Sequence, residues 1–410
     1  MKEKVVLAYS GGLDTTTIIP WLKETFDYDV ICCCIDVGQG EELDGLDERA
    51  KLSGASKLYI EDIVDEFCED YIVPCVQANA VYENKYLLGT SMARPGIAKK
   101  LVEIARKEGA VAICHGATGK GNDQIRFELG IKALAPDIKV IAPWRMTDVW
   151  TIQSRQDEID YCKAHGIDLP FAVDSSYSRD RNLWHVSHEG LELENPALEP
   201  NYKHILMMTV PPEEAPDEPE YVTMTFEKGV PTSVNGKKMK VSDIIRTLNE
   251  LGGKHGIGIV DIVENRVVGM KSRGIYETPG GTILMEAHQQ LEELVLDRAT
   301  AEVKKEMGNK LAQVCYEGKW FTPLREAIQA FVESTQEYVT GEVKFKLYKG
   351  NITKAGTTSP YSLYSESLAS FTTGDLYDHH DADGFITLFG LPLKVRAMKM
   401  AEVAAKNNNK

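Results

Sequence analysis

The chain opens with an apolar strand, a pair of glycines and a helix start, all within its first sixteen residues. Val5 to Leu7 are apolar and β-prone, as is typical of a strand buried on both faces. Gly11 and Gly12 permit a sharp turn and a close approach of the backbone to an anion. Four residues here can cap the following helix: Ser10, Asp14, Thr15 and Thr16. The segment predicts a phosphate-binding loop, although the same turn also occurs in proteins that bind nothing there.

A second glycine-rich loop supports the ligand-binding interpretation. Gly116, Gly119 and Gly121 follow the apolar run Ala110 to Ile113 and precede a helix with apolar periodicity. Three glycines in six residues destabilise an ordinary turn, because each glycine loses more backbone conformational entropy on folding than another residue would. A ligand that needs close backbone approach explains them better.

Asn122, Asp123 and Arg126 stand at the start of that helix. Asn122 and Arg126 are four residues apart, so they project from one face, with Asp123 beside them. A carboxylate can receive an ammonium group, and a guanidinium can hold a carboxylate through two parallel hydrogen bonds. The cluster predicts a site for a zwitterionic amino acid, the alternative being a surface helix cap with an ion pair.

Taken together, these motifs resemble the argininosuccinate synthase family. The first loop, SGGxD, is similar to the PP-loop of ATP pyrophosphatases and differs from the Walker A pattern. The order and spacing of seven segments carry the resemblance nearly from end to end. They are Ala8 to Thr16, Tyr86 to Ser91 with Ala93 to Pro95, His115 to Glu128, Ile141 to Arg145, Asp261 to Arg266, Gly269 to Thr282, and Lys346 to Asn351.

The resemblance implies a reaction that needs no side-chain nucleophile. ATP would drive the condensation of citrulline with aspartate through a citrullyl-adenylate, giving argininosuccinate, AMP and pyrophosphate in arginine biosynthesis. Catalysis would rest on positioning and charge stabilisation, with Mg²⁺ bridging the phosphates and no metal held by a dedicated side-chain cage.

The resemblance also implies substrate contacts, position by position. ATP would meet Ala8, Tyr9, Ser10, Gly11, Gly12, Leu13, Asp14, Thr15, Thr16, Ile35 and Gly116; Thr16 departs from the more usual serine but keeps the hydroxyl. Citrulline would meet Tyr86, Ser91, Asn122, Arg126, Ser178, Ser187, Glu264 and Tyr276. Aspartate would meet Thr118, Asn122 and Asp123. For Ser178, the nearby Ser175 and Ser176 leave room for a shift in the alignment.

Composition limits the partners and the compartment. A formal charge of −16 argues against a nucleic-acid backbone as partner, since such surfaces are normally basic. No apolar run is long enough to span a bilayer and no signal-peptide pattern is present. The eight cysteines contain no CxxC pair, and Cys32, Cys33 and Cys34 fall in an apolar run. We therefore expect a cytoplasmic enzyme with reduced thiols, no membrane and no nucleic-acid partner.

The pattern of apolar segments predicts an α/β fold with a doubly wound, mostly parallel sheet. Strands are expected at Val5–Tyr9, Val30–Ile35, Lys57–Ile60, Val111–Cys114 and Lys139–Ala142, with a helix over about 97–108. At 410 residues, more than one domain is expected. We place a nucleotide-binding domain at 1–170, an α+β synthetase domain at 171–375 and a C-terminal arm at 376–410.

The second half mixes strands and helices. A proline-rich connector spans about 195–220, and Val222, Met224 and Phe226 alternate before the turn signal Asn235-Gly236. Helices are expected at Leu284–Lys305 and Pro323–Val339, with a strand at Val343–Tyr348. The basic, helix-prone residues 394–410 have little core of their own, and the family resemblance suggests that they dock on a neighbouring subunit of a homotetramer.

Two other functions remain open at this stage. Another PP-loop adenylating enzyme, acting on tRNA or on an amide-forming substrate, would share the first motif. It would be expected to show basic surface and often paired catalytic cysteines. A non-catalytic ATP-binding module would account for the first 170 residues alone.

Overall fold

The computed structural model describes residues 2–167, 177–370 and 378–408. These residues form two compact units, Met1–Tyr361 and Ser362–Lys410. The predicted domain boundaries at 170 and 375 lie outside the described residues, so the division into 1–170, 171–375 and 376–410 stays a prediction. No helix in the described part of the chain has the length and apolar character needed to cross a membrane.

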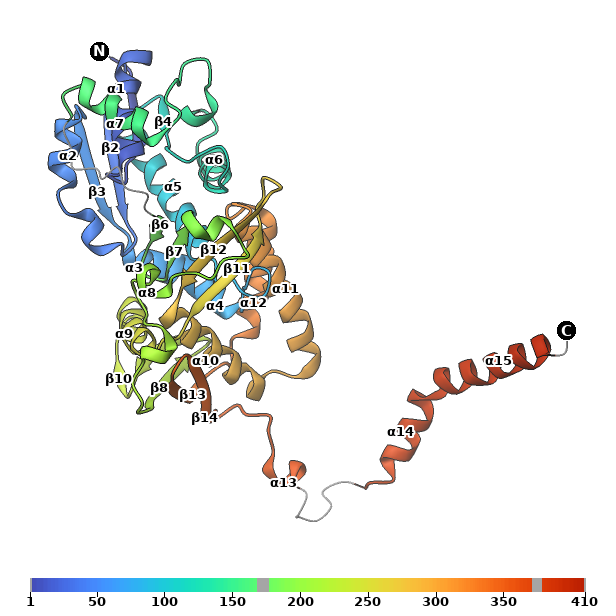
Figure 1. The fold of residues 1–410 in the computed structure, drawn as a ribbon. Coiled ribbons are helices and arrows are strands. Elements are labelled where there is room, and N and C mark those ends of the chain that lie inside the picture. The colour runs from blue at the N-terminus through green and yellow to red at the C-terminus, as the bar shows by residue number, and fades with distance from the viewer. Residues whose placement is uncertain (1, 168–176, 371–377, 409–410) are drawn as a thin grey trace. The chain divides into compact units, whose positions relative to one another are not determined.

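The first unit begins with the predicted parallel sheet (Figure 1). Its order is β3-β2-β1-β4-β5, with every pair parallel. The strands are β1 (Lys4–Ala8), β2 (Asp29–Asp36), β3 (Lys57–Asp62), β4 (Ala112–Cys114) and β5 (Lys139–Ile141). Their positions agree with the predicted strands. Because the chain leaves β1 toward β2 and later returns to the other side at β4, the sheet has a switch point between β1 and β4.

Helices cover both faces of this sheet, as the doubly wound prediction requires. α1 (Leu13–Phe26) and α2 (Leu46–Leu52) pack on the face of Val5, Leu7 and Cys32, and α7 (Arg155–Ala164) packs on α1. α5 (Gly89–Glu108) and α6 (Asp123–Leu134) contribute to the core on the face of Val6 and Ile31. Each of the eight cysteines is buried and unbridged.

Two antiparallel sheets follow. One has the order β11-β12-β7-β6, from β6 (Ser178–Arg181), β7 (Val186–Glu189), β11 (Ile259–Asn265) and β12 (Lys271–Glu277). The other has the order β10-β9-β8-β13-β14, from β8 (Glu220–Glu227), β9 (Val230–Val234), β10 (Lys237–Lys238), β13 (Gly341–Tyr348) and β14 (Asn351–Thr358). The predicted turn is confirmed, since Asn235 and Gly236 both have positive φ between β9 and β10.

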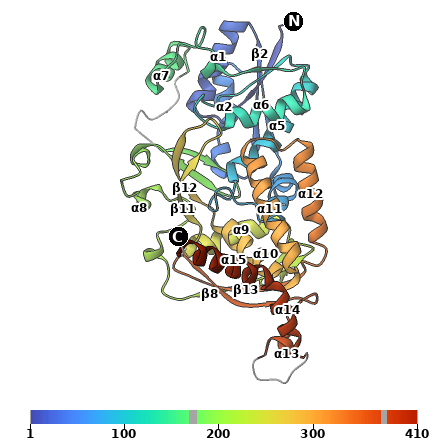
Figure 2. The same ribbon diagram turned by 90° about the vertical axis from the view of Figure 1, so that its right-hand side faces the viewer.

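The helices of this half are α9 (Val241–Lys254), α10 (Pro279–Val295), α11 (Arg298–Tyr316) and α12 (Pro323–Thr335), with α11 and α12 side by side (Figure 2). Short helices elsewhere in the first unit are α3 (Val64–Phe67), α4 (Val73–Gln77) and α8 (Tyr202–Ile205).

Two predicted helices need correction. The single helix expected over 284–305 is wrong: α10 ends at Val295, and Asp297 caps α11 by accepting a hydrogen bond from the Thr300 amide at 3.1 Å. The helix expected over 97–108 begins earlier, at Gly89, and includes Pro95 in its interior.

The second unit consists of α13 (Glu366–Ala369), α14 (Asp381–Phe389) and α15 (Leu391–Asn408). The predicted C-terminal helix is therefore present, with a slightly earlier start. Its apolar side chains are exposed, including Leu391, Leu393, Val395, Met398 and Met400.

Candidate active site

A cavity of about 690 Å³ lies beyond the carboxyl ends of β1, β2 and β4, at the switch point of the parallel sheet. Ten of the eleven residues predicted to bind ATP line it: Ala8, Tyr9, Ser10, Gly11, Gly12, Leu13, Asp14, Thr15, Ile35 and Gly116. Thr16 is fully buried behind them, and its Oγ1 lies 3.3 Å from the Tyr9 hydroxyl. The two glycine loops thus meet at one site.

The first glycine loop leaves the start of α1 free of side-chain caps. We expected Ser10, Asp14, Thr15 or Thr16 to cap the helix, which is wrong: Gly12 occupies the N-cap position and no side chain caps it. Ser10 Oγ instead lies 3.2 Å from Thr15 Oγ1. Gly11 has a φ of +75°, and a Cβ there would lie 2.1 Å from Leu46 Cδ2. The backbone N–H groups of the first turn are therefore available to an anion.

Five arginines line the same cavity: Arg49, Arg94, Arg155, Arg179 and Arg181. Arg49 is held by the loop itself, because its Nη1 donates to the Gly11 carbonyl at 3.0 Å. Guanidinium groups suit the oxygens of a triphosphate. Sequence reasoning missed this set, since its members come from α2, α5, α7 and β6 and have no common spacing.

Asp123, at the start of α6, also lines the cavity and is held by two guanidinium groups. Its Oδ2 accepts from Arg94 Nε and Nη2 at 2.9 and 2.7 Å, and its Oδ1 accepts from Arg126 Nη1 at 2.9 Å. Burial alone would raise the pKa of this carboxyl group, but the two arginines lower it to about 2. Asp123 is therefore ionised at neutral pH and is already paired with the guanidinium groups of Arg94 and Arg126.

A second cluster surrounds Glu264 on β11. Tyr276 and Tyr316 donate hydroxyl hydrogen bonds to its two oxygens at 2.6 and 2.8 Å. The Tyr86 and Tyr276 rings lie 4.5 Å apart, and the Arg126 guanidinium lies 4.9 Å from the centre of the Tyr316 ring. Four residues predicted to bind citrulline, Tyr86, Arg126, Glu264 and Tyr276, are thus brought together from distant parts of the chain.

Tyr316 was not predicted. It lies at the end of α11, and its carbonyl accepts from Arg126 Nε at 3.0 Å. An aromatic residue at the end of an apolar helix face looks like core from sequence alone, so no local signal could have marked it.

The other predicted residues lie around or outside these clusters. Ser187 is buried on β7 opposite Tyr276, Ser91 is fully buried in α5, and Asn122 Oδ1 accepts from the Val267 amide at 2.9 Å. Ser178, on β6, and Thr118, in the second glycine loop, are exposed.

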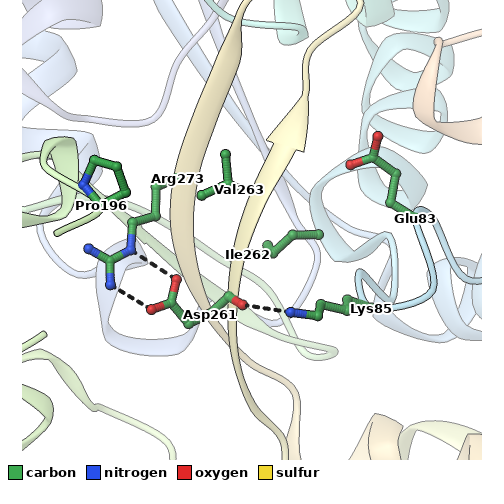
Figure 3. Close-up of a pocket in the computed structure, with 7 residues that line it drawn as sticks. All are labelled: Glu83, Lys85, Pro196, Asp261, Ile262, Val263 and Arg273. Atoms are coloured by element: carbon green, nitrogen blue, oxygen red, sulfur yellow. Dashed lines mark hydrogen bonds and ion pairs between the residues drawn. The ribbon is translucent and has the colours of Figure 1, made fainter. Parts of the chain in front are cut away.

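A separate hollow of about 440 Å³ is lined by residues of β11 and β12 together with Glu83, Lys85 and Pro196 (Figure 3). Arg273 donates to both Asp261 oxygens at 3.0 and 2.6 Å, and Lys85 Nζ lies 3.4 Å from the Asp261 carbonyl. Glu83, also in its lining, accepts from Asn265 Nδ2 at 2.5 Å, and none of the predicted site residues lines the hollow. This hollow is therefore not part of the candidate site.

Comparison with known proteins identifies the family of the chain. The family model described as the arginosuccinate synthase N-terminal HUP domain matches residues 4–168, and the one described as the arginosuccinate synthase C-terminal domain matches residues 177–396. Curated relatives named argininosuccinate synthase match in full: the protein of Agathobacter rectalis is 88% identical and that of Lachnospira eligens 80% identical, each over 100% of both chains. The protein of Lachnoclostridium phytofermentans is 78% identical over 98% of this chain and 99% of its own.

Proposed function

Because this chain belongs to the argininosuccinate synthase family and carries out the ATP-dependent condensation of citrulline with aspartate in arginine biosynthesis, we propose that the cavity beyond β1 and β4 is its active site. The observation that carries the proposal is the convergence of two glycine loops, five arginines and Asp123 on one cavity. A PP-loop enzyme acting on tRNA is not favoured, since full-length relatives carry the argininosuccinate synthase name.

The chemistry begins with activation of citrulline. The ureido carbon is a poor electrophile, because two nitrogens donate electrons to it. Attack of the ureido oxygen on the α-phosphate of ATP releases pyrophosphate and gives a citrullyl-adenylate. The aspartate amine then forms the C–N bond, and the electron pair of the C–O bond leaves with AMP.

The proposed contacts divide among three substrates. The residues from Ala8 to Thr16, with Ile35 and Gly116, hold ATP, and uncapped N–H groups of α1 face its phosphates. Citrulline binds at Tyr86, Ser91, Asn122, Arg126, Ser178, Ser187, Glu264 and Tyr276. Aspartate binds at Thr118, Asn122 and Asp123. Support comes from the Glu264 cluster and from Arg126, which joins it to Asp123.

The chain offers carboxylates for the Mg²⁺ that accompanies ATP. Asp14 lines the cavity, and Glu158 of α7 packs beside it with a buried Oε1 that has no hydrogen-bond partner in the described residues. Carboxylate oxygens together with substrate phosphates suit Mg²⁺. When bound, the ion would neutralise charge on the phosphates, while the arginines of the cavity orient them.

We further propose that the enzyme is a cytoplasmic homotetramer in which α15 packs on a neighbouring subunit. Support comes from the exposed apolar side chains of α14 and α15, among them Phe389 and Leu393, in a chain of net charge −16.

Isotope exchange tests the order of the two steps. Citrulline alone should support exchange of label between pyrophosphate and ATP, because adenylation precedes aspartate attack. Exchange that requires aspartate, or that occurs with aspartate alone, would contradict the proposed order.

A further inference from the structure

The second half of the reaction needs a proton acceptor. Aspartate enters as an ammonium, which has no lone pair, so its nitrogen must lose a proton before it attacks the ureido carbon. Asp123 is the proposed ammonium contact, but both of its oxygens accept hydrogen bonds from guanidinium groups. A carboxylate held in this way is a poor base, so the acceptor lies elsewhere.

Arg94 joins Asp123 to a second carboxylate. Its Nη2 lies 2.7 Å from Asp123 Oδ2 and 2.9 Å from Asp180 Oδ1. Asp180, on β6, lines the same cavity as Asp123. The two carboxylates therefore flank one guanidinium at the wall of the ATP site, close to the proposed position of the aspartate ammonium.

The two carboxylates differ in their second oxygen. Asp180 Oδ2 is buried and has no hydrogen-bond partner in the described part of the chain. Its neighbour is His185 Nε2, at 4.0 Å. An oxygen that no donor occupies has a lone pair free to accept first a hydrogen bond and then a proton.

His185 is built firmly into this position. It is fully buried, its Nε2 lies 3.1 Å from Thr90 Oγ1, and its backbone amide donates to Asn182 Oδ1. It packs directly on Gly89, where a Cβ would lie 2.3 Å from the imidazole ring. Burial lowers the pKa of His185 to about 4, so the ring is neutral at pH 7. A neutral imidazole leaves the adjacent carboxylate oxygen able to receive a proton.

From this arrangement we infer that Asp180 is the proton acceptor for the aspartate amine and that His185 is its positioning residue. The inference rests on the proposed function. Because Oδ2 is buried in the substrate-free protein, the Asp180 carboxyl group must turn toward the cavity that it lines to take the first proton from the ammonium, and the freed lone pair then forms the C–N bond. As the C–O bond breaks, its electron pair goes to AMP, whose phosphate takes the second proton from the new C–N nitrogen.

The charged and titratable groups near His185 come from several elements. They are Asp180 on β6, Arg94 on α5, Asp123 on α6 and His188 on β7, with the Tyr86 and Tyr276 rings 6.3 and 6.0 Å away. A pH profile of the second half-reaction must be interpreted against all of them, so the test compares each variant with the unaltered enzyme.

Asp180→Asn is the first test, with Asp137→Asn as the matched control, because Asp137 pairs with Arg106 on the exterior. We expect pyrophosphate–ATP exchange with citrulline alone to fall much less than argininosuccinate formation does; a small loss of exchange is expected because Asp180 also lines the ATP cavity and pairs with Arg94. Argininosuccinate formation should fall by roughly 100-fold or more at pH 7 and recover as pH rises, because the free amine then becomes available. The control should change neither rate.

His185→Gln is the second test, with His165→Gln as its control, because His165 is exposed and pairs with Glu24. We expect normal exchange, an unchanged KM for aspartate and a kcat for argininosuccinate lowered about tenfold. If Asp180→Asn forms argininosuccinate normally, the proton goes elsewhere, such as to the AMP phosphate, and the inference fails. Equal loss of exchange and synthesis in either variant would also overturn it. Failure of the unaltered enzyme to exchange with citrulline would instead refute the proposed order of steps.

Discussion

Arg126 is the residue whose replacement separates the two amino-acid sites most clearly. Its guanidinium makes three contacts: Nε donates to the Tyr316 carbonyl at 3.0 Å, Nη1 donates to Asp123 at 2.9 Å, and the group stacks 4.9 Å from the Tyr316 ring centre. Lysine has a single compact ammonium, so Arg126→Lys can keep the charge but not this set of directions.

The size of the effect follows from the contacts that lysine loses. The bond to the Tyr316 carbonyl contributes about 1 kcal/mol, which should appear as lower stability. Loss of the two-pronged contact with the citrulline carboxylate should cost about 1.5–3 kcal/mol, or roughly 10- to 150-fold in the citrulline requirement. The aspartate requirement should change much less, because Asp123 keeps Arg94.

Two assays measure these effects. Pyrophosphate–ATP exchange at varied citrulline gives the citrulline concentration that the enzyme requires, and argininosuccinate synthesis at varied aspartate gives the aspartate concentration that it requires. Arg106→Lys is the matched control, since Arg106 also pairs with a carboxylate, Asp137, but on the exterior. An unchanged citrulline requirement in Arg126→Lys, or an equal rise for both substrates, would refute the assignment of Arg126.

Three further outcomes are expected. Without Mg²⁺, burial and the neighbouring Asp14 raise the pKa of Glu158 from 4.5 to about 8, so the folded state keeps a proton that the unfolded chain releases. The contribution of this bound proton to the free energy of unfolding is full below pH 4.5 and is lost as pH rises to 8, by at most about 1.4 kcal/mol per pH unit. Urea unfolding of Glu158→Gln should therefore show a free energy of unfolding that depends less on pH than in the unaltered enzyme. The same pH dependence in both proteins would contradict this. Gly11→Ala should cost about 1–2 kcal/mol at its positive φ and raise the ATP requirement, and a normal KM for ATP would contradict the role of the loop. Deleting residues 391–410 should convert the proposed tetramer to smaller species in sedimentation, whereas an intact tetramer would mean that the arm is a solvated tail.

The parallel sheet could be predicted because its central strands β1 and β2 are continuous apolar runs that can be recognised without their partners. Lys4–Ala8 and Asp29–Asp36 are buried on both faces, and the glycines that follow β1 and β4 line the cavity. The four-stranded antiparallel sheet could not be predicted in the same way. Its edge strand β6 is Ser-Arg-Asp-Arg, which forms a strand only because β7 supplies the pairing.

Residues of the candidate site could be predicted only where they belong to a local sequence motif. Gly11, Asp123 and Arg126 lie in motifs whose spacing carries meaning. Arg94 and Tyr316 complete the site from α5 and the end of α11, and their roles depend on tertiary contacts with Asp123 and Glu264. The break between α10 and α11 was missed because the apolar periodicity continues across it. The break is marked only by Asp297, whose side chain caps the start of α11.

The fate of the citrulline ureido oxygen tests the central claim most directly. With ¹⁸O in that position, the proposed adenylate carries the label between carbon and the α-phosphate, and cleavage of the C–O bond leaves it on AMP. Mass spectrometry should therefore find one ¹⁸O per AMP formed and none in pyrophosphate or argininosuccinate. Unlabelled AMP would show that the α-phosphate is never attacked by citrulline, and the account of this site would be wrong.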